Sequence, residues 1–149
     1  MNTKEQLYAF CHRFLNDRFN IISTRIQQIQ KSLETETKSS AGDKHETGRA
    51  MLQLEREKAG NQLLEVQKQL EVFAKVNVSS LSEIARLGSL VKTDKANYFL
   101  AVSAGLIIID AINYYAVSIS SPIGKAILGK STSHVITFNG TTQKIIEVL

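Results

Sequence analysis

Asp43 and Glu46 are the two residues whose types and spacing could do metal chemistry. Carboxylates three residues apart lie on one face of a helix, and carboxylate oxygens are the ligands that Mg²⁺ prefers. The pair could therefore share a metal ion. The same two residues could instead cap the start of a helix, because acidic side chains in a first turn interact favourably with the helix dipole. Both interpretations stay open, and His45 between them is expected to be an exposed residue rather than a ligand.

A second string matches a nucleotide-binding motif letter for letter. Gly124-Lys-Ala-Ile-Leu-Gly129-Lys130-Ser131 fits G-x-x-x-x-G-K-[ST]. That chemistry needs a flexible loop between a buried strand and a long helix, where backbone N–H groups surround the phosphates. Here Ser121-Pro122 predicts a short helix that contains the first glycine, and a strand-like run follows Ser131. We therefore expect no nucleotide at residues 124–131.

Two long amphipathic helices must position the acidic pair. Their apolar residues step by threes and fours, as in the seam of a coiled coil. These residues are Leu15, Phe19, Ile22, Ile26, Ile29 and Leu33, then Leu52, Ala59, Leu63, Val66, Leu70 and Phe73. Facing members are equidistant from a point between Gly42 and Asp43, which predicts an antiparallel hairpin. We expect helices over residues 4–36 and from Asp43 or Glu46 to 76, a tip at 37–46, and a Glu36–Arg49 salt bridge below the tip.

The pattern changes to β from Gly88 onward. Strands are expected at 90–93, 98–102, 106–109 (a buried run), 114–119, 135–138 and 144–148, with a short helix at 121–128. Asn139-Gly140 predicts a hairpin turn between the last two strands. Residues 77–86 are the expected joint, with a helical turn through Leu81, Ile84 and Leu87. The predicted fold is α+β: a coiled-coil hairpin (1–76) followed by a small antiparallel β domain with one short helix (77–149).

Composition excludes several classes of protein. An apolar content of 43% and a charged content of 21% are globular values, which argue against a wholly disordered chain. The single cysteine, Cys11, rules out an internal disulfide and is expected to be buried. The apolar stretch 98–117 contains Asp110 and Asn113, so buried strands fit it better than a membrane span. We expect a cytoplasmic protein without membrane contact, and a net charge of +4 is too small to predict nucleic-acid binding alone.

The helix at 121–128 also carries a family resemblance. Ser120-Ser-Pro-Ile-Gly-Lys-Ala-Ile-Leu-Gly-Lys130 closely resembles the signature S-P-[IL]-[AG]-[RK]-A-L-[IL]-G-K of the bacterial transcript cleavage factors, the Gre family. It stands at the family's place, after the strand at 115–119 and before the closing hairpin. Gly88-Ser-Leu-Val-Lys-Thr93 resembles the start of the family's C-terminal domain. The order of domains agrees as well, since an antiparallel coiled coil precedes an FKBP-like domain in the family.

The resemblance implies RNA polymerase as the partner. In the family, the C-terminal domain docks at the rim of the polymerase secondary channel, and the coiled coil enters it. Acids at the tip then help to hold Mg²⁺ and water at the polymerase active site, which promotes hydrolysis of the 3′ end of backtracked RNA. Such a factor is not an enzyme alone, shares the polymerase Mg²⁺ without a cofactor of its own, and meets the nascent RNA indirectly, close to the DNA and RNA of the transcribing complex.

The resemblance also lends candidate docking residues. They are Ser121, Pro122, Ile123, Lys125 and Lys130. Ile123, like Leu128, could equally belong to the core of the domain. Lys125 and Lys130 could face acidic residues of the polymerase or could serve solubility alone.

The tip departs from the family pattern. Cleaving members carry a run [DE]-L-x-E-N-x-E-Y, whose first acid and the acid three residues later do the work. Aligning this chain on Arg49 or on His45 leaves both acidic places without an acid, while Asp43 and Glu46 recover the spacing a few residues later. Asp43 and Glu46 are therefore the candidate tip acids. Two alternatives remain: a non-cleaving regulator that binds the same channel, and a coiled-coil adaptor with no role at the polymerase.

Overall fold

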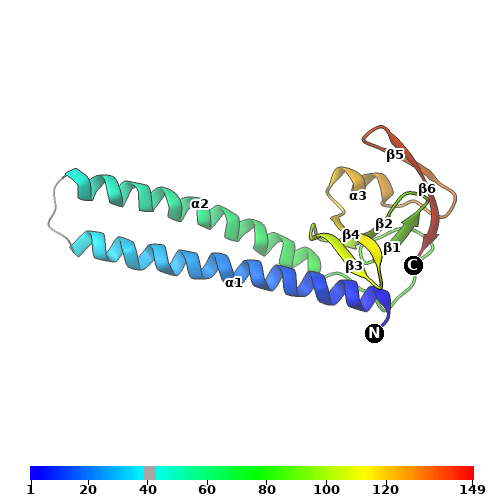
Figure 1. Ribbon diagram of the computed structural model, residues 1–149, viewed down its shortest axis with the longest axis horizontal. Coiled ribbons are helices and arrows are strands. Elements are labelled where there is room, and N and C mark those ends of the chain that lie inside the picture. Colours follow the sequence, from blue (N-terminus) through cyan, green and yellow to red (C-terminus); the bar gives the residue numbers. More distant parts are fainter. Residues whose placement is uncertain (39–42) are drawn as a thin grey trace. The chain divides into compact units, whose positions relative to one another are not determined.

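The computed structural model describes the backbone of residues 1–38 and 43–149 and the side chains of residues 1–36 and 46–149 (Figure 1). The chain forms two compact units. One consists of Leu15–Leu70, and the other combines Met1–Phe14 with Glu71–Leu149. These two units are not the same as the two domains expected from the sequence, which meet at residue 76. The first fourteen residues belong to the same unit as the C-terminal part of the chain. No helix among the described residues is long and apolar enough to cross a membrane.

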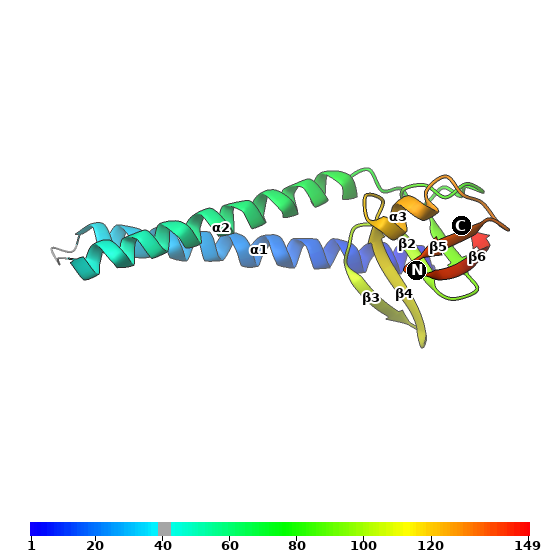
Figure 2. The ribbon, with the colours of Figure 1, turned by 90° about the horizontal axis from the view of Figure 1, so that it is seen from above.

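The first unit is the predicted helical hairpin. Helix α1 (Thr3–Lys38) and helix α2 (Asp43–Phe73) run antiparallel, as Figures 1 and 2 show. The most deeply buried residues of the unit are seam residues, each at most 7% exposed: Leu15, Ile22, Ile29, Ala59 and Val66. The remaining seam residues of the unit are half-buried. The periodicity of the sequence therefore predicts the buried face of both helices correctly.

The second unit is built on one six-stranded sheet. Its strands are β1 (Leu90–Thr93), β2 (Asn97–Ala101), β3 (Gly105–Ile109), β4 (Ile112–Ser118), β5 (Val135–Phe138) and β6 (Thr141–Val148). Their order in the sheet is β3-β4-β2-β1-β6-β5, and helix α3 (Pro122–Ile127) lies between β4 and β5 in the chain. Residues from several strands and α3, among them Val91, Leu100, Ile127 and Ile145, form a core that is closed to solvent.

The sheet is mixed rather than wholly antiparallel as predicted. β2 and β4 pair in parallel, with Tyr98 opposite Tyr115 and Leu100 opposite Val117. The cause is topological, because β3 and β4 form a hairpin and the returning strand β4, not β3, lies beside β2. The other pairs are antiparallel, including the predicted hairpin of β5 and β6 around Asn139-Gly140.

Two further expectations are wrong. The run at 106–109 is an edge strand in which Ile107 alone is buried, while Ile108 is 63% exposed. The joint after α2 contains no helical turn, and Leu81 and Ile84 are exposed there. Polar side chains near the joint bond to neighbouring backbone groups, as Asn77 Oδ1 does with the Ser79 N–H at 2.9 Å. Such local bonds offer the backbone an alternative to helix.

Candidate functional site

Helix α3 contains the residues that resemble the family signature, and its start is fixed by a cap. Ser121 is the N-cap and Pro122 follows at the first helical position. The Gly124 N–H donates to Ser121 Oγ at 3.1 Å, and Ser121 Oγ donates to the Ser118 carbonyl at 2.6 Å. The helix thus begins directly at the end of β4, as the sequence predicts.

The glycine at position 124 is required by close packing rather than by phosphate binding. A Cβ placed on Gly124 would lie 1.9 Å from the Ser118 carbonyl oxygen, so no larger residue fits without movement of the backbone. Gly124 lies inside α3 and is buried there, while Gly129 follows the helix with a φ of 81°. The nucleotide-motif string therefore forms a packed helical turn and its cap. No flexible phosphate loop exists at this place.

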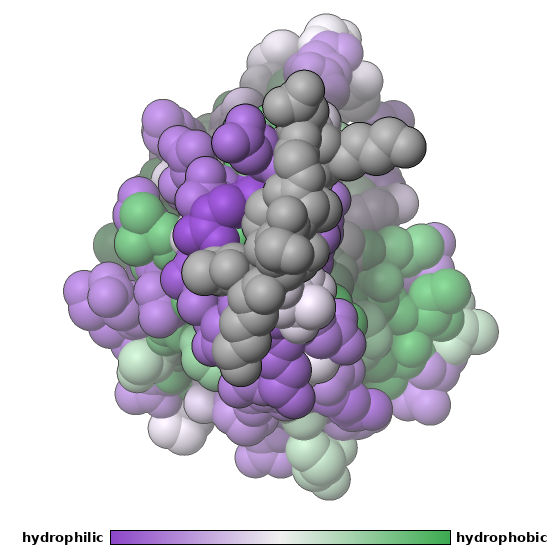
Figure 3. All heavy atoms as spheres, turned by 90° about the vertical axis from the view of Figure 1, so that its left-hand side faces the viewer, coloured by the Kyte–Doolittle hydropathy of each residue, from purple (hydrophilic) through white to green (hydrophobic). Residues whose placement is uncertain are grey.

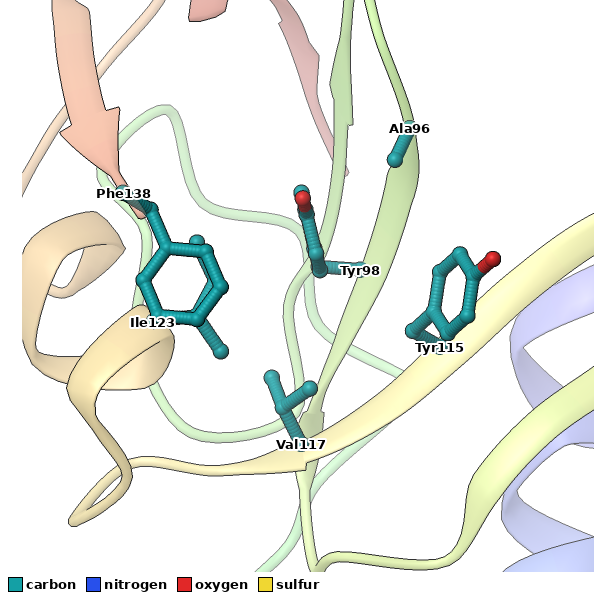
Figure 4. A pocket seen from close by; sticks show the side chains of 6 residues that line it. All are labelled: Ala96, Tyr98, Tyr115, Val117, Ile123 and Phe138. Atoms are coloured by element: carbon teal, nitrogen blue, oxygen red, sulfur yellow. The ribbon is translucent and has the colours of Figure 1, made fainter. Parts of the chain in front are cut away.

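An apolar pocket lies beside α3. Its volume is about 370 Å³. The lining residues come from β2, β4, β5, α3 and the turn before β2: Ala96, Tyr98, Tyr115, Val117, Ile123 and Phe138. Figure 4 shows Phe138 and Ile123 on one side and Tyr115 on the other, with Tyr98 and Val117 between them. Such a cavity can receive an apolar side chain of a partner.

A buried hydrogen-bond network positions the Tyr98 side chain in the wall of the pocket. The Tyr98 hydroxyl donates to Gln143 Oε1 at 3.0 Å, and Thr93 Oγ1 lies 2.8 Å from the same oxygen. The rings of Tyr98 and Tyr115 have centroids 6.2 Å apart with an interplanar angle of 36°. Because the phenol of Tyr98 is held from behind, its ring presents a rigid apolar face to the pocket.

The structure separates the five predicted docking residues by exposure. Ile123 is 6% exposed and packs into the core, yet one side of it lines the pocket. Pro122, Lys125 and Lys130 are exposed, and Ser121 is half-buried because it caps the helix. The other lining residues carry no motif in the sequence. The two tyrosines stand on neighbouring strands, but the parallel register that brings them together is visible only in the fold.

The hairpin tip is described in part. α2 begins at Asp43, so Asp43 and Glu46 lie in its first turn, three residues apart and on one face of the helix. Glu46 is exposed, while the side chain of Asp43 lies outside the described residues, as does His45. Within the part of the chain that the structure describes, no three His, Cys, Asp or Glu residues could hold a metal ion together.

The contacts just below the tip join the two helices. Arg49 Nη1 donates to the Leu33 carbonyl at 3.4 Å, and a Cβ on Gly48 would lie 3.6 Å from Glu36 Oε1. The guanidinium and the carboxylate thus both reach across to the opposite helix, whereas the predicted Glu36–Arg49 salt bridge stays a prediction. Seen from this end, the coloured residues at the near end of the hairpin are mainly hydrophilic (Figure 3).

Comparison with known proteins gives a structural similarity without a family assignment. No family model and no curated protein match the sequence. The chain is similar to the crystal structure of GreA factor homolog 1 (Gfh1) of Thermus thermophilus, at 17% identity and a TM-score of 0.37, over 91% of this chain and 92% of that one. A second structure, of the transcription factor Gfh1, is 18% identical with a TM-score of 0.35, over 90% of both chains. The function is therefore argued from this chain's own residues.

Proposed function

We propose that this protein is a Gre-like factor that binds RNA polymerase and inserts its helical hairpin into the secondary channel. The observation that carries the proposal is the signature-like segment 120–130. It forms the capped helix α3, whose Ile123 lines an open apolar pocket. The segment thus packs closely through Gly124 and also borders a cavity of about 370 Å³ that is large enough for a partner's side chain.

In the proposed complex, the pocket receives an apolar side chain from the rim of the channel. Complete burial of one such side chain is worth about 1.5–3 kcal/mol, and the aromatic walls supply most of the contact. Lys125 and Lys130 are exposed, and neither forms an ion pair among the described residues, so both are available to acidic groups of the polymerase. This arrangement, with an apolar anchor and cations around it, favours a protein partner over nucleic acid.

The hairpin supplies the reach. Helix α1 has 36 residues. At 1.5 Å per residue, the part of α1 that lies within the unit Leu15–Leu70, residues 15–38, spans about 36 Å, which is still more than the diameter of a small domain. Because the two helices bury their seam against each other, they can extend into a channel without further support from the sheet.

At the tip, Asp43 and Glu46 are proposed to complete a Mg²⁺ site at the polymerase active centre. Carboxylates suit this metal, and the first turn of α2 holds the pair on one face. Mg²⁺ bound there would stabilise the charge that develops when water attacks the 3′ end of backtracked RNA. The protein's own part is to deliver and orient two carboxylates, so the proposed factor stimulates hydrolysis by the polymerase and is not itself an enzyme.

A second candidate is a channel-binding regulator that does not stimulate cleavage. The departure of the tip from the acidic run of cleaving relatives favours it, because Asp43 and Glu46 stand a few residues later than the family's pair. In this case the two acids serve to start α2, and the protein acts by occupying the channel.

Transcript cleavage in arrested elongation complexes separates these candidates. We expect wild-type protein to release short 3′ RNA fragments, and the double variant Asp43→Asn/Glu46→Gln, which keeps polar groups in the first turn, to lower the rate at least tenfold. The matched control is Glu55→Gln/Glu57→Gln, two exposed acids in the middle of α2. Polymerase binding without any release would favour the non-cleaving regulator. Failure to bind polymerase would refute the proposal and favour the adaptor.

A further inference from the structure

Lys4 is a buried cation with few partners. Lys4 is 7% exposed, and its Nζ donates to the Ser80 carbonyl at the long distance of 3.5 Å. An ammonium group has three donors, and this is its one hydrogen bond within the described part of the chain, so two donors have no acceptor there. Burial of a charged group with incomplete hydrogen bonding is costly unless a counter-charge is present.

A second cation converges on the same serine. Arg86 Nη2 donates to Ser80 Oγ at 2.8 Å, so the carbonyl of Ser80 receives Lys4 and its hydroxyl receives Arg86. The pKa of Lys4 lies below its ordinary value, first because the group is desolvated by burial and second because the Arg86 charge is close. Among the described residues, no ion pair joins a carboxylate to either cation. The three residues form what we call the Lys4–Arg86 cluster: Lys4, Ser80 and Arg86.

We propose that the Lys4–Arg86 cluster binds a phosphate group as a dianion. Two like charges held on one serine repel each other, and a bound anion would reverse that repulsion. The charge decides between oxyanions, because a dianion neutralises both cations whereas a carboxylate leaves one uncompensated. The remaining N–H donors of the ammonium and the guanidinium match the three acceptor oxygens of a phosphate.

Access to the cluster comes from the side of Arg86. That residue is exposed, whereas Lys4 is buried, so an anion would meet the guanidinium at the surface and the ammonium deeper inside. The backbone here is already ordered, since the Arg86 N–H donates to Ser89 Oγ at 3.0 Å and Asn77 Oδ1 accepts from the Ser79 hydroxyl at 2.7 Å. The site is independent of the pocket beside α3 and of the hairpin tip, and it does not depend on the proposed function.

Thermal unfolding of the full chain in inorganic phosphate tests the proposal, with ionic strength matched by NaCl. We expect 20 mM phosphate to raise the unfolding midpoint by about 3 °C. Arg86→Gln and Lys4→Met should each lose most of this rise, and Lys58→Met, which removes an exposed lysine on α2, should keep it. Arg86 is exposed, so its variant keeps the test valid if Lys4→Met fails to fold.

Titration with phosphate, acetate and phosphoserine, followed by calorimetry, gives the direct measurement. Phosphate should bind at least tenfold more tightly than acetate, and Arg86→Gln should weaken it at least tenfold. Phosphoserine that binds as well as phosphate would identify a phosphorylated side chain as the source, whereas binding of phosphate alone would identify the free ion. Equal binding of acetate, or a midpoint shift that Arg86→Gln leaves unchanged, would overturn the proposal.

Discussion

Burial controls the chemistry of the single thiol. Cys11 is completely buried, and desolvation raises the pKa of its thiol from 9.0 to about 12. Because the thiolate is the nucleophile, the folded protein should be nearly inert toward alkylating reagents at pH 8. We expect iodoacetamide to label Cys11 at least a hundredfold more slowly in native protein than in denatured protein, measured by mass spectrometry. Comparable rates would show that the thiol is accessible.

The same pKa shift makes stability depend on pH in a defined direction. Between about pH 9 and pH 12, the unfolded chain releases the thiol proton and the folded chain retains it. Stability from this group is therefore complete below pH 9 and falls as the pH rises, by at most about 1.4 kcal/mol per pH unit. Urea denaturation at pH 8 and pH 10 measures this effect. The difference in the free energy of unfolding between wild type and Cys11→Ala should be smaller at pH 10. Comparison of the two proteins at each pH cancels the contributions of the other titrating groups.

At the scale of single elements, the hairpin depends on its seam. Val66 is completely buried, whereas Leu64, two residues earlier on α2, is 50% exposed. Val66→Ala removes two buried methyl groups and leaves a small cavity, so we expect a loss of about 1.5–2.5 kcal/mol in the free energy of unfolding. Leu64→Ala is the matched control and should change stability by less than about 0.5 kcal/mol. Urea denaturation followed by circular dichroism measures the free energy of unfolding of both variants. Equal losses in the two variants would show that the seam does not determine the stability of the hairpin.

The helices could be predicted from the sequence because their signals are local. Apolar residues spaced three and four apart indicate which face of α1 and α2 is buried. The two residues Ser121-Pro122 are enough to mark the start of α3. The parallel pairing of β2 with β4 could not be predicted in this way. It depends on which strand returns to lie beside β2, a choice made between residues far apart in the chain.

The candidate site was predictable to the same limit. Ile123 could be singled out through its motif, although the sequence left open whether it belongs to the core or to a surface, and the structure gives it a part in both. Tyr98, Tyr115 and Phe138 carry no motif. Their side chains come together only when β2, β4 and β5 have folded into one sheet. The Lys4–Arg86 cluster was missed for the same reason, since 76 residues separate Lys4 from Ser80.

At the scale of the whole molecule, the proposed function divides two tasks between the two units. The unit of Leu15–Leu70 would enter the channel, and the unit that contains the sheet would provide affinity through the pocket. Changes in the pocket should therefore weaken polymerase binding whether or not the tip supports cleavage. Tyr115 suits this test because it is 39% exposed and lines the pocket from β4.

Displacement of a fluorescently labelled Gre-family factor from RNA polymerase measures this affinity directly. Tyr115→Ala removes an aromatic wall, and truncation of an aromatic anchor at an interface typically costs 1 kcal/mol or more, so we expect about tenfold higher protein concentration at half-displacement. Ile146→Ala, which truncates a 56% exposed residue of β6 outside the pocket, is the matched control and should displace like wild type. Asp43→Asn/Glu46→Gln should also displace like wild type, because the tip acts on catalysis in the proposed division. If Tyr115→Ala displaces the labelled factor as well as wild type does, affinity resides elsewhere and the pocket is not the docking site.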